Sequence, residues 1–429
     1  MESKTISNAD ETSPKTLTSI FSERILAGIN SAHYQQIFSF AHNEYYKGIS
    51  SSNETTRCDF TFGNPREMAL PAFLSSYQKY IEPLNPQWYA YCDENNSNSH
   101  PSRKIVASNL SKQFSPLSFD CEDIHLVTGN IGGLYTCLSM LLNKDDQVIF
   151  STPTWFLYEA MILRCSATPI IVKSDQKTFD LDLDTIKAHI NDKTKIIIIN
   201  SPHNPTGRIY SLSLLQSLAN LLLQEYERRK IHYGDDAQPI WLISDEAYKK
   251  IIFKNSQFIC PASVYPYTFI CYTYGKTLLN PGIRLGYIAL SDQIPFYYRS
   301  LFRLYIPQTR MMNGFMVPDC ISQYSIQDIE TLSIGIDMDR LEKKLNIMCD
   351  MLISIGYEIP IRPEGTFYVM VKSPLEDDRA FCVILSEYNI WCLPGSVCVM
   401  KGYFRICLTA TEEMIEKSKD GFREAFKRA

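Results

Sequence analysis

The chain has 429 residues, of which 45% are hydrophobic and 21% charged, and this length suffices for one large domain and a smaller partner. A net charge of −5 argues against nucleic acid or an anionic membrane as the main partner. No apolar run approaches the roughly 18–20 residues that span a bilayer. Thirteen cysteines without a C-x-x-C pair, and seven histidines without metal-ligand spacing, predict reduced thiols, a cytoplasmic protein and no metal site.

The N-terminal region divides into two segments. Residues 1–15 are polar, with no apolar signal core and no periodic pattern, so we predict a disordered tail. Residues 16–58 carry apolar residues at helical spacing as far as Tyr46 and then reach Gly48, which predicts a helical arm that is part of the smaller domain. A short strand or turn is expected at 59–65, and a loop at 94–101.

From about residue 123, short apolar runs alternate with helical segments. We predict strands at 126–128, 148–150, 196–199, 241–243 and 269–271, and helices at 134–142 and 212–227. This alternation is typical of an α/β fold with a mostly parallel sheet flanked by helices. The sequence therefore predicts a large domain over 59–310 and a smaller α+β domain over 311–429, which includes a long helix at 337–355.

A lysine near the end of one predicted strand is the first candidate site residue. Lys276 has the hydroxyl of Thr273 three residues before it and the guanidinium of Arg284 eight residues after it. This arrangement suits a lysine that forms a Schiff base with an aldehyde whose phosphate is held by the hydroxyl and the arginine. Pyridoxal 5′-phosphate (PLP) is such an aldehyde.

Two further turns after strands carry candidate side chains. Asn204 begins an N-P-T-G turn whose proline and glycine fix its geometry, so its amide is a rigidly placed donor. Asp245 could pair with a protonated pyridine nitrogen, and the hydroxyl of Tyr248 could reach the ring oxygen. The structural alternatives are a simple turn, a helix N-cap at Asp245 and a packing role for Tyr248.

Three more positions are ambiguous when taken alone. Backbone N–H groups of the turn at 129–133, which includes Asn130, Ile131 and Gly132, would suit a phosphate at a helix N-terminus, although glycines at such turns are common. Trp155 could stack on a planar ring or belong to the core. Arg405 lies among apolar residues and needs a carboxylate, either from a substrate or from an internal salt bridge.

Together these segments resemble the class I/II aminotransferases, the aspartate-aminotransferase-like group of fold-type I PLP-dependent enzymes. The likeness runs from about residue 59 to the C-terminus, and the motifs occur in the family's order. It implies PLP as cofactor, with Lys276 as its Schiff-base lysine. The resemblance further assigns cofactor contacts and a substrate-carboxylate contact to Asn204, Asp245, Tyr248, Arg284 and Arg405.

The resemblance extends to weaker matches and shows departures. Gly63 matches a turn beside the substrate, and Tyr91 matches a tyrosine that reaches the phosphate of the neighbouring subunit, although Tyr89 is close by. The segments 363–368 and 393–396 match small-domain signatures. The departures are Gly275 in place of a serine, Asn130 and Ile131 in place of smaller residues, and a longer stretch before Asp245 with an expected surface loop at 233–236.

The function that this resemblance implies is transamination between an amino acid and a 2-oxo acid by a homodimer with shared sites. Lys276 would be the general acid/base, with Asp245 and Tyr248 as the other catalytic residues. The same scaffold supports elimination, oxidation, decarboxylation and cyclisation, because the rest of the pocket sets the outcome. A non-catalytic PLP-binding regulator is a more remote alternative, since the segment before residue 59 is too short and insufficiently basic for a DNA-binding domain.

Overall fold

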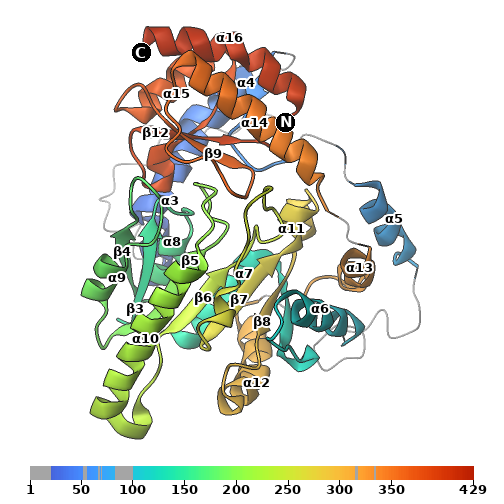
Figure 1. Cartoon of the computed structure of the whole chain (residues 1–429), viewed down its shortest axis with the longest axis vertical. Helices are drawn as coiled ribbons and strands as arrows, with labels where there is room; N and C mark the ends of the chain where they lie inside the picture. Colours follow the sequence, from blue (N-terminus) through green and yellow to red (C-terminus); the bar gives the residue numbers. More distant parts are fainter. Residues whose placement is uncertain are drawn as a thin grey trace.

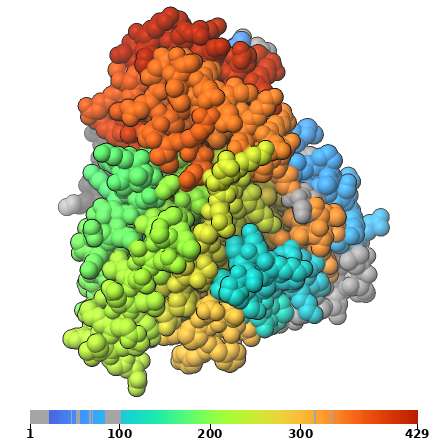
Figure 2. All heavy atoms as spheres, viewed as in Figure 1, coloured from blue at the N-terminus to red at the C-terminus, as the bar shows by residue number. Residues whose placement is uncertain are grey.

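The computed structural model describes residues 21–51, 56–65, 68, 70–82, 100–314, 317–332 and 335–429. The predicted tail 1–15, nearly all of the predicted loop 94–101, and Tyr91 lie outside the described residues. A larger body built on a twisted sheet carries a smaller body that contains the C-terminal helices (Figure 1). The space-filling view shows the two bodies in direct contact along their shared face (Figure 2).

Seven strands form the central sheet in the order β2-β8-β7-β6-β5-β3-β4. Neighbouring strands of this sheet are parallel except at β8, which runs antiparallel to β2 and β7. The bounds are β2 Ile124–Thr128, β3 Gln147–Thr152, β4 Thr168–Lys173, β5 Thr194–Asn200, β6 Trp241–Asp245, β7 Thr268–Thr273 and β8 Leu285–Leu290. The predicted α/β class with a mostly parallel sheet is confirmed.

Helices cover both faces of the sheet, which explains the uninterrupted apolar strands (Figure 1). In β5, Ile196 and Ile198 belong to the core under α7 (Gly129–Leu141) and α12 (Phe296–Met312), whereas Ile197 and Ile199 belong to the core under α10 (Leu212–Tyr233). Successive side chains of a strand point to opposite faces, so a strand covered on both sides needs apolar residues throughout. Further helices of this body include α8 Tyr158–Arg164, α9 Leu183–His189 and α6 His100–Gln113.

Two predicted helices are longer than the sequence pattern indicated. The helix expected at 134–142 begins already at Gly129, so the glycine-containing turn is its first turn. The helix expected at 212–227 continues to Tyr233, because ion pairs from Glu225 to Arg228 and Arg229 support its polar end. A short 3₁₀ turn follows at Gly234–Asp236, and its residues are exposed, as the predicted surface loop required.

The smaller body combines short strands with three long helices. The antiparallel strands have the order β11-β12-β9, with bounds β9 Tyr368–Lys372, β11 Leu393–Pro394 and β12 Tyr403–Cys407. Strand β1 (Cys58–Asp59) pairs in parallel with β10 (Ile390–Trp391). The helices are α14 Met338–Ile355, α15 Asp378–Glu387 and α16 Glu412–Arg428. The predicted long helix corresponds to α14, whose N-cap is Asp337.

The N-terminal arm contacts both bodies. Its elements are α2 Glu23–Ile29, α3 Ala32–Ser39, a π-helical segment Phe40–Tyr45 and α4 Tyr46–Ser51, which runs past the helix end expected at Gly48. Helix α2 packs on α8, while Phe40 and Tyr45 share a core with Trp391. Because the arm contacts both bodies, we describe it as a separate segment, and its predicted membership of the smaller domain stays a prediction.

The start of the smaller domain is better supported near α14 than at residue 311. Helix α13 (Cys320–Thr331) packs on α6 and on α5 (Pro71–Lys79) in the larger body. Its residues Ile326 and Ile329 share a core with Leu110, and the smaller body's core begins with residues of α14. We therefore propose a boundary near Asp337. No helix among the described residues is long and apolar enough to cross a membrane.

Candidate active site

A cavity of about 360 Å³ lies beside the carboxyl ends of β5, β6 and β7, where the two bodies meet. Ligands bind at this edge in open parallel sheets. The predicted site residues that line it are Gly63, Asn130, Ile131, Trp155, Asn204, Asp245, Tyr248, Thr273, Lys276, Arg284 and Arg405. Gly132 is buried just behind the wall, where a Cβ atom would come within 2.7 Å of the Thr128 hydroxyl. The structure thus brings together residues that are up to 342 positions apart, from Gly63 to Arg405.

Asp245 ends β6 as a buried carboxylate held by neutral donors. Its Oδ1 accepts hydrogen bonds from Asn130 Nδ2 at 2.6 Å and from the backbone N–H of Ala247 at 3.2 Å. Its Oδ2 accepts one from the Tyr158 hydroxyl at 2.5 Å. Burial raises the pKa of Asp245, while these three hydrogen bonds oppose that rise. No ion pair to Asp245 forms within the described residues, although its charge acts on Lys276, whose pKa it raises.

Tyr158 is a hydrogen-bond partner of Asp245 that the sequence analysis did not predict. It is the first residue of α8 and is fully enclosed between the sheet and Trp155, whose ring lies 5.5 Å away in an edge-to-face arrangement. Burial, followed by the Asp245 charge, raises its pKa well above the ordinary value, so it is a permanent hydrogen-bond donor. The signal available in the sequence was a further aromatic residue three positions after Trp155.

Asn204 connects the sheet to the smaller body. Its Oδ1 accepts a hydrogen bond from Arg405 Nη1 at 3.0 Å, and its Nδ2 faces the Tyr248 hydroxyl at 3.4 Å. The Tyr248 hydroxyl donates in turn to that of Tyr368 at 3.4 Å. Tyr248 is therefore part of a polar network. The residues after Asp245 form a turn and not a helix, so Asp245 is not a helix N-cap.

Arg405 is 3% exposed and has no carboxylate partner in the described part of the chain. Its Nη2 donates to the carbonyl of Thr61 at 3.0 Å, and its guanidinium lies 4.1 Å from the ring centre of Tyr368. Its Nε has no hydrogen-bond partner among the described residues. Among the residues that the structure describes, Arg405 thus forms no internal salt bridge, and this buried cation at the cavity wall is available to an anionic ligand.

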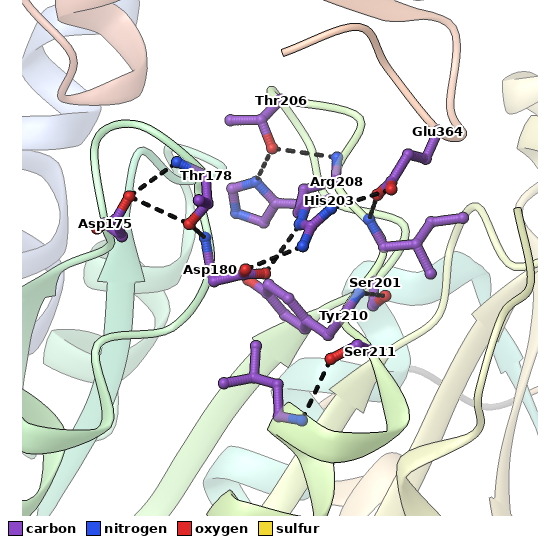
Figure 3. Close-up of polar contacts among 12 residues, drawn as sticks. Asp175, Thr178, Asp180, Ser201, His203, Thr206, Arg208, Tyr210, Ser211 and Glu364 are labelled. Carbon is purple, nitrogen blue, oxygen red and sulfur yellow. Dashed lines mark hydrogen bonds and ion pairs between the residues drawn. The ribbon is translucent and has the colours of Figure 1, made fainter. Parts of the chain in front are cut away.

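The turn that carries Asn204 is anchored from outside by Arg208 (Figure 3). The guanidinium of Arg208 binds both carboxylate oxygens of Asp180, at 2.8 and 2.9 Å, and one oxygen of Glu364 at 3.0 Å. The other oxygen of Glu364 accepts from the backbone N–H of Ile209 at 2.8 Å. Gly207 closes the turn with φ +74, where a side chain would collide with Pro363 at 2.5 Å. These contacts tie the N-P-T-G turn to the segment that leads into β9.

Lys276 lies in the short helix α11 (Tyr274–Thr277) directly after β7. Thr273 caps that helix, since its hydroxyl accepts from the Gly275 N–H at 3.2 Å and donates to the Leu285 carbonyl at 3.0 Å. Burial lowers the pKa of Lys276 to about 8, and Arg405 and Arg284 act in the same direction. Near neutral pH the amine of Lys276 is therefore mostly protonated, but its neutral, nucleophilic fraction is far larger than that of an ordinary lysine.

The first turn of α7 and Arg284 form a cradle with positive potential. Gly129 has φ +70, and a Cβ atom there would approach the Arg284 guanidinium to 2.7 Å. Arg284 itself is in the left-handed conformation, and its Nη1 donates to the Pro281 carbonyl at 2.6 Å. Helix N-terminal N–H groups and a guanidinium together suit a phosphate.

Aromatic side chains complete the cavity wall. Trp155 lines it, as the sequence suggested, and so do Phe62, Phe156 and Tyr368, which the sequence did not single out as site residues. Gly63 is required by close approach, because a Cβ atom would lie 2.8 Å from the Tyr368 hydroxyl. Within the described residues, no cluster of histidine, cysteine and carboxylate side chains is arranged to hold a metal ion.

The architecture matches that of solved aminotransferases. An aminotransferase from Eubacterium rectale superposes with a TM-score of 0.82 at 24% identity, over 94% of this chain and 97% of that chain. The Thermus thermophilus aspartate aminotransferase with maleate has a TM-score of 0.78 at 20% identity, over 94% and 99%. The chain thus has the fold-type I architecture of PLP-dependent enzymes.

Residues 103–420 match the family described as aminotransferase class I and II, and the chain belongs to this family. It is 27% identical over 382 residues to a probable aspartate/prephenate aminotransferase of Rickettsia bellii, covering 83% of this chain and 86% of that protein. It is 26% identical over 295 residues to the aspartate aminotransferase of Geobacillus stearothermophilus, covering 65% and 70%. The resemblance noted in the sequence is confirmed: the protein is a PLP-dependent aminotransferase.

Proposed function

We propose that the cavity around Lys276 is the active site at which this aminotransferase moves an α-amino group from an amino acid to a 2-oxo acid. This proposal rests on two buried groups of opposite charge that line one cavity, each without an ion-pair partner among the described residues. Asp245 is an anion without a protein cation, and Arg405 is a cation without a protein anion, among the described residues. The Lys276 amine lines the same cavity.

The residues fit PLP by their chemistry. The cradle of Gly129 and Arg284 suits the phosphate, and the unmet carboxylate of Asp245 suits a protonated pyridine nitrogen. Asn204 and Tyr248 offer donors to the ring oxygen, and Trp155 offers an aromatic surface. When bound, PLP supplies an electron-withdrawing ring that stabilises negative charge developing at the substrate Cα. Asn130, Ile131, Gly132, Thr273 and, from a second subunit, Tyr91 remain proposed contacts.

Lys276 and Arg405 have complementary tasks in this proposal. The guanidinium of Arg405 binds the α-carboxylate of the amino acid, and its stacking on Tyr368 and bond to Asn204 fix its plane. The neutral amine of Lys276 would accept the proton from the substrate Cα and, once protonated, would return a proton to the cofactor carbon that carried the aldehyde. The low pKa of Lys276, about 8, suits a group that must both take and give a proton.

We also propose a homodimer with shared sites that works in the cytoplasm. Large apolar side chains on one surface helix support self-association, since exposed apolar patches mark interaction surfaces. These exposed residues of α12 are Phe296, Tyr297, Leu304, Tyr305, Met311 and Met312. The molar mass in solution tests the dimer: twice the 49.3 kDa of one chain is expected, and a monomer at working concentration would contradict it.

The test of transamination is a single half-reaction. Purified holoenzyme is mixed with one amino acid at a time and no 2-oxo acid, and the cofactor absorption band, the 2-oxo acid and ammonia are measured. Aspartate, after which the bacterial relatives are named, is the first compound to try. We expect the band to bleach with one equivalent of 2-oxo acid per site. Ammonia released over many turnovers would instead establish elimination or oxidation on this scaffold.

A Lys276→Ala variant tests the proposed general acid/base role of the lysine. We expect kcat to fall by about 10²–10⁴-fold, the usual contribution of a general acid/base. Lys254→Ala, a change at an exposed lysine paired with Asp339, is the control and should leave kcat unchanged. Full activity of Lys276→Ala would reject the assignment.

A further inference from the structure

Asn130 departs from the family's usual small residue, and its side chain has a contact that the sequence did not predict. It belongs to the first turn of α7, where the backbone faces the proposed phosphate cradle. Its side chain instead reaches 115 residues along the chain to Asp245, with Nδ2 at 2.6 Å from Oδ1. One residue thus connects the two ends of the proposed cofactor site.

The orientation of this amide follows from chemistry. If the amide were flipped, its oxygen would face a carboxylate oxygen at 2.6 Å, which is unfavourable while Asp245 is ionised. With nitrogen facing Asp245, the amide oxygen of Asn130 is buried and has no partner among the described residues. A buried acceptor without a partner costs free energy. The hydrogen bond to Asp245 must therefore contribute more free energy than the unpaired amide oxygen loses.

Hydrogen bonds hold the Asp245 carboxylate from two sides. Tyr158 on α8 donates to Oδ2, and Asn130 on α7 and the Ala247 N–H donate to Oδ1. A carboxylate offers about four acceptor positions, so these three bonds leave one for a donor in the cavity. Two opposed side chains also fix the rotation of the carboxylate plane.

We propose that Asn130 is a positioning residue, which fixes the Asp245 carboxylate and favours its ionised form opposite the cofactor ring. This inference rests on the proposed function, in which Asp245 faces the ring nitrogen. Other ionisable groups also act on or lie near Asp245: Glu246 directly after β6, Tyr158 on α8, Tyr248, Cys271 on β7 and Lys276 on α11. None of them replaces the fixed neutral donor that Asn130 supplies to Oδ1.

The decisive variants are Asn130→Ala and Asn130→Asp. Asn130→Ala removes the donor. Asn130→Asp keeps the shape of the side chain but places a second carboxyl group against Asp245, and a hydrogen bond between the two forms only when one of them is protonated. A hydrogen bond to a charged group contributes about tenfold or more to an equilibrium constant. We expect both variants to bind PLP at least about tenfold more weakly at pH 8, and Asn130→Asp to recover toward wild type as the pH falls below about 6.

Asn143→Ala is the control, because Asn143 is an exposed asparagine just after α7 and does not line the cavity. Its PLP dissociation constant and the pH dependence of its cofactor absorption should follow wild type. In Asn130→Ala, the pH-dependent absorption of bound PLP should shift, while the KM for the amino acid changes less than kcat. A merely structural role would lower thermal stability without moving the absorption profile.

Two results separate the possible failures. If wild-type protein takes up no PLP, the proposed function fails. If wild type binds PLP but Asn130→Ala and Asn130→Asp show the wild-type affinity and the wild-type pH profile, the positioning role of Asn130 is rejected and the proposed function stands.

Discussion

Two consecutive acidic residues, at and directly after the end of β6, have opposite surroundings. Glu246 turns away from the cavity, where its carboxylate pairs with Lys249 at 3.0 Å and both side chains are fully buried. The Lys249 ammonium lies 5.0–5.3 Å from the ring centres of Phe114, Tyr272 and Tyr287. Asp245, one residue earlier, faces the cavity and finds only neutral donors among the described residues.

The difference separates a structural charge, that of Glu246, from the charge of Asp245, for which we propose a functional role. A buried charge is costly unless it is paired, so Glu246 and Lys249 complete each other inside the fold. Asp245 and Arg405 line one cavity and lack partners of opposite charge in the described residues, which is the state that a ligand with a cationic ring and an anionic carboxylate would complete. The same contrast indicates which substitutions should affect catalysis and which should affect folding.

The sharpest way to break this contrast is to neutralise each acid in turn. Asp245→Asn should lower kcat by about 10²–10³-fold, the usual loss for one preorganised electrostatic contact, with little loss of stability. Glu246→Gln leaves Lys249 buried without its partner, so the free energy of unfolding should fall by about 3–5 kcal/mol. Steady-state kinetics and urea unfolding of the two variants measure both quantities. Equal effects of the two variants on kcat would contradict the distinction.

Arg405 extends the contrast to the cationic side of the cavity. Arg405→Ala should lower kcat/KM for the amino acid by about 10- to 100-fold, because a bidentate bond to a carboxylate is lost. PLP affinity should change little. Arg405→Lys keeps the charge and should recover only part of the loss, since a lysine cannot bind both oxygens in one plane. Parallel losses in PLP affinity and in kcat/KM would assign Arg405 a structural role.

The pH dependence of cofactor uptake tests the third charged group, Lys276. Its pKa is about 8 in the folded apoprotein, below the ordinary lysine value of about 10.4. The neutral, reactive amine is therefore lost as the pH falls below about 8, and the rate of PLP uptake should fall with it. Between pH about 8 and about 10.4, Lys276 is mostly neutral in the folded protein but still protonated in the unfolded chain. The contribution of this group to the free energy of unfolding therefore rises with pH across that range. A stopped-flow midpoint near 10 would contradict the lowered pKa.

The smallest effect is expected where charges are paired at the surface. Arg208, Asp180 and Glu364 have side chains between 23% and 32% exposed, so solvent weakens their attraction (Figure 3). Arg208→Ala should lower the free energy of unfolding by about 1 kcal/mol, and the loss should shrink in high salt. Glu364→Gln, which removes one of the two ion pairs, should have a smaller effect. A large loss of PLP affinity in Arg208→Ala would show that the anchor governs the site and not only stability.

The sequence predicted those parts of the site that depend on local rules. Parallel strands put their carboxyl ends at one edge, so the turns after β5, β6 and β7 were expected to meet, and the cavity joins Asn204, Asp245 and Lys276. The glycine turn was identified, but its inclusion in α7 was not, because glycine lowers the expected helix propensity.

Contacts between distant segments could not be predicted in the same way. Tyr158 lies 87 residues from Asp245, and Arg405 lies 344 residues from the Thr61 carbonyl. Periodicity shows which face of a helix is apolar but not which partner covers it. The predicted boundary at residue 311 therefore left α13 in the smaller domain, whereas its packing on α6 supports the boundary near Asp337 that we propose. The side-chain contact of Asn130 likewise depends on the position of α7 relative to β6.

The most direct test of the central claim is the ¹⁵N NMR signal of protein loaded with PLP labelled at the ring nitrogen. If Asp245 is the unmet anion of the cavity, the nitrogen should be protonated in wild type and in Glu246→Gln, and neutral in Asp245→Asn. A neutral nitrogen in wild type, or a protonated one in Asp245→Asn, would contradict the account.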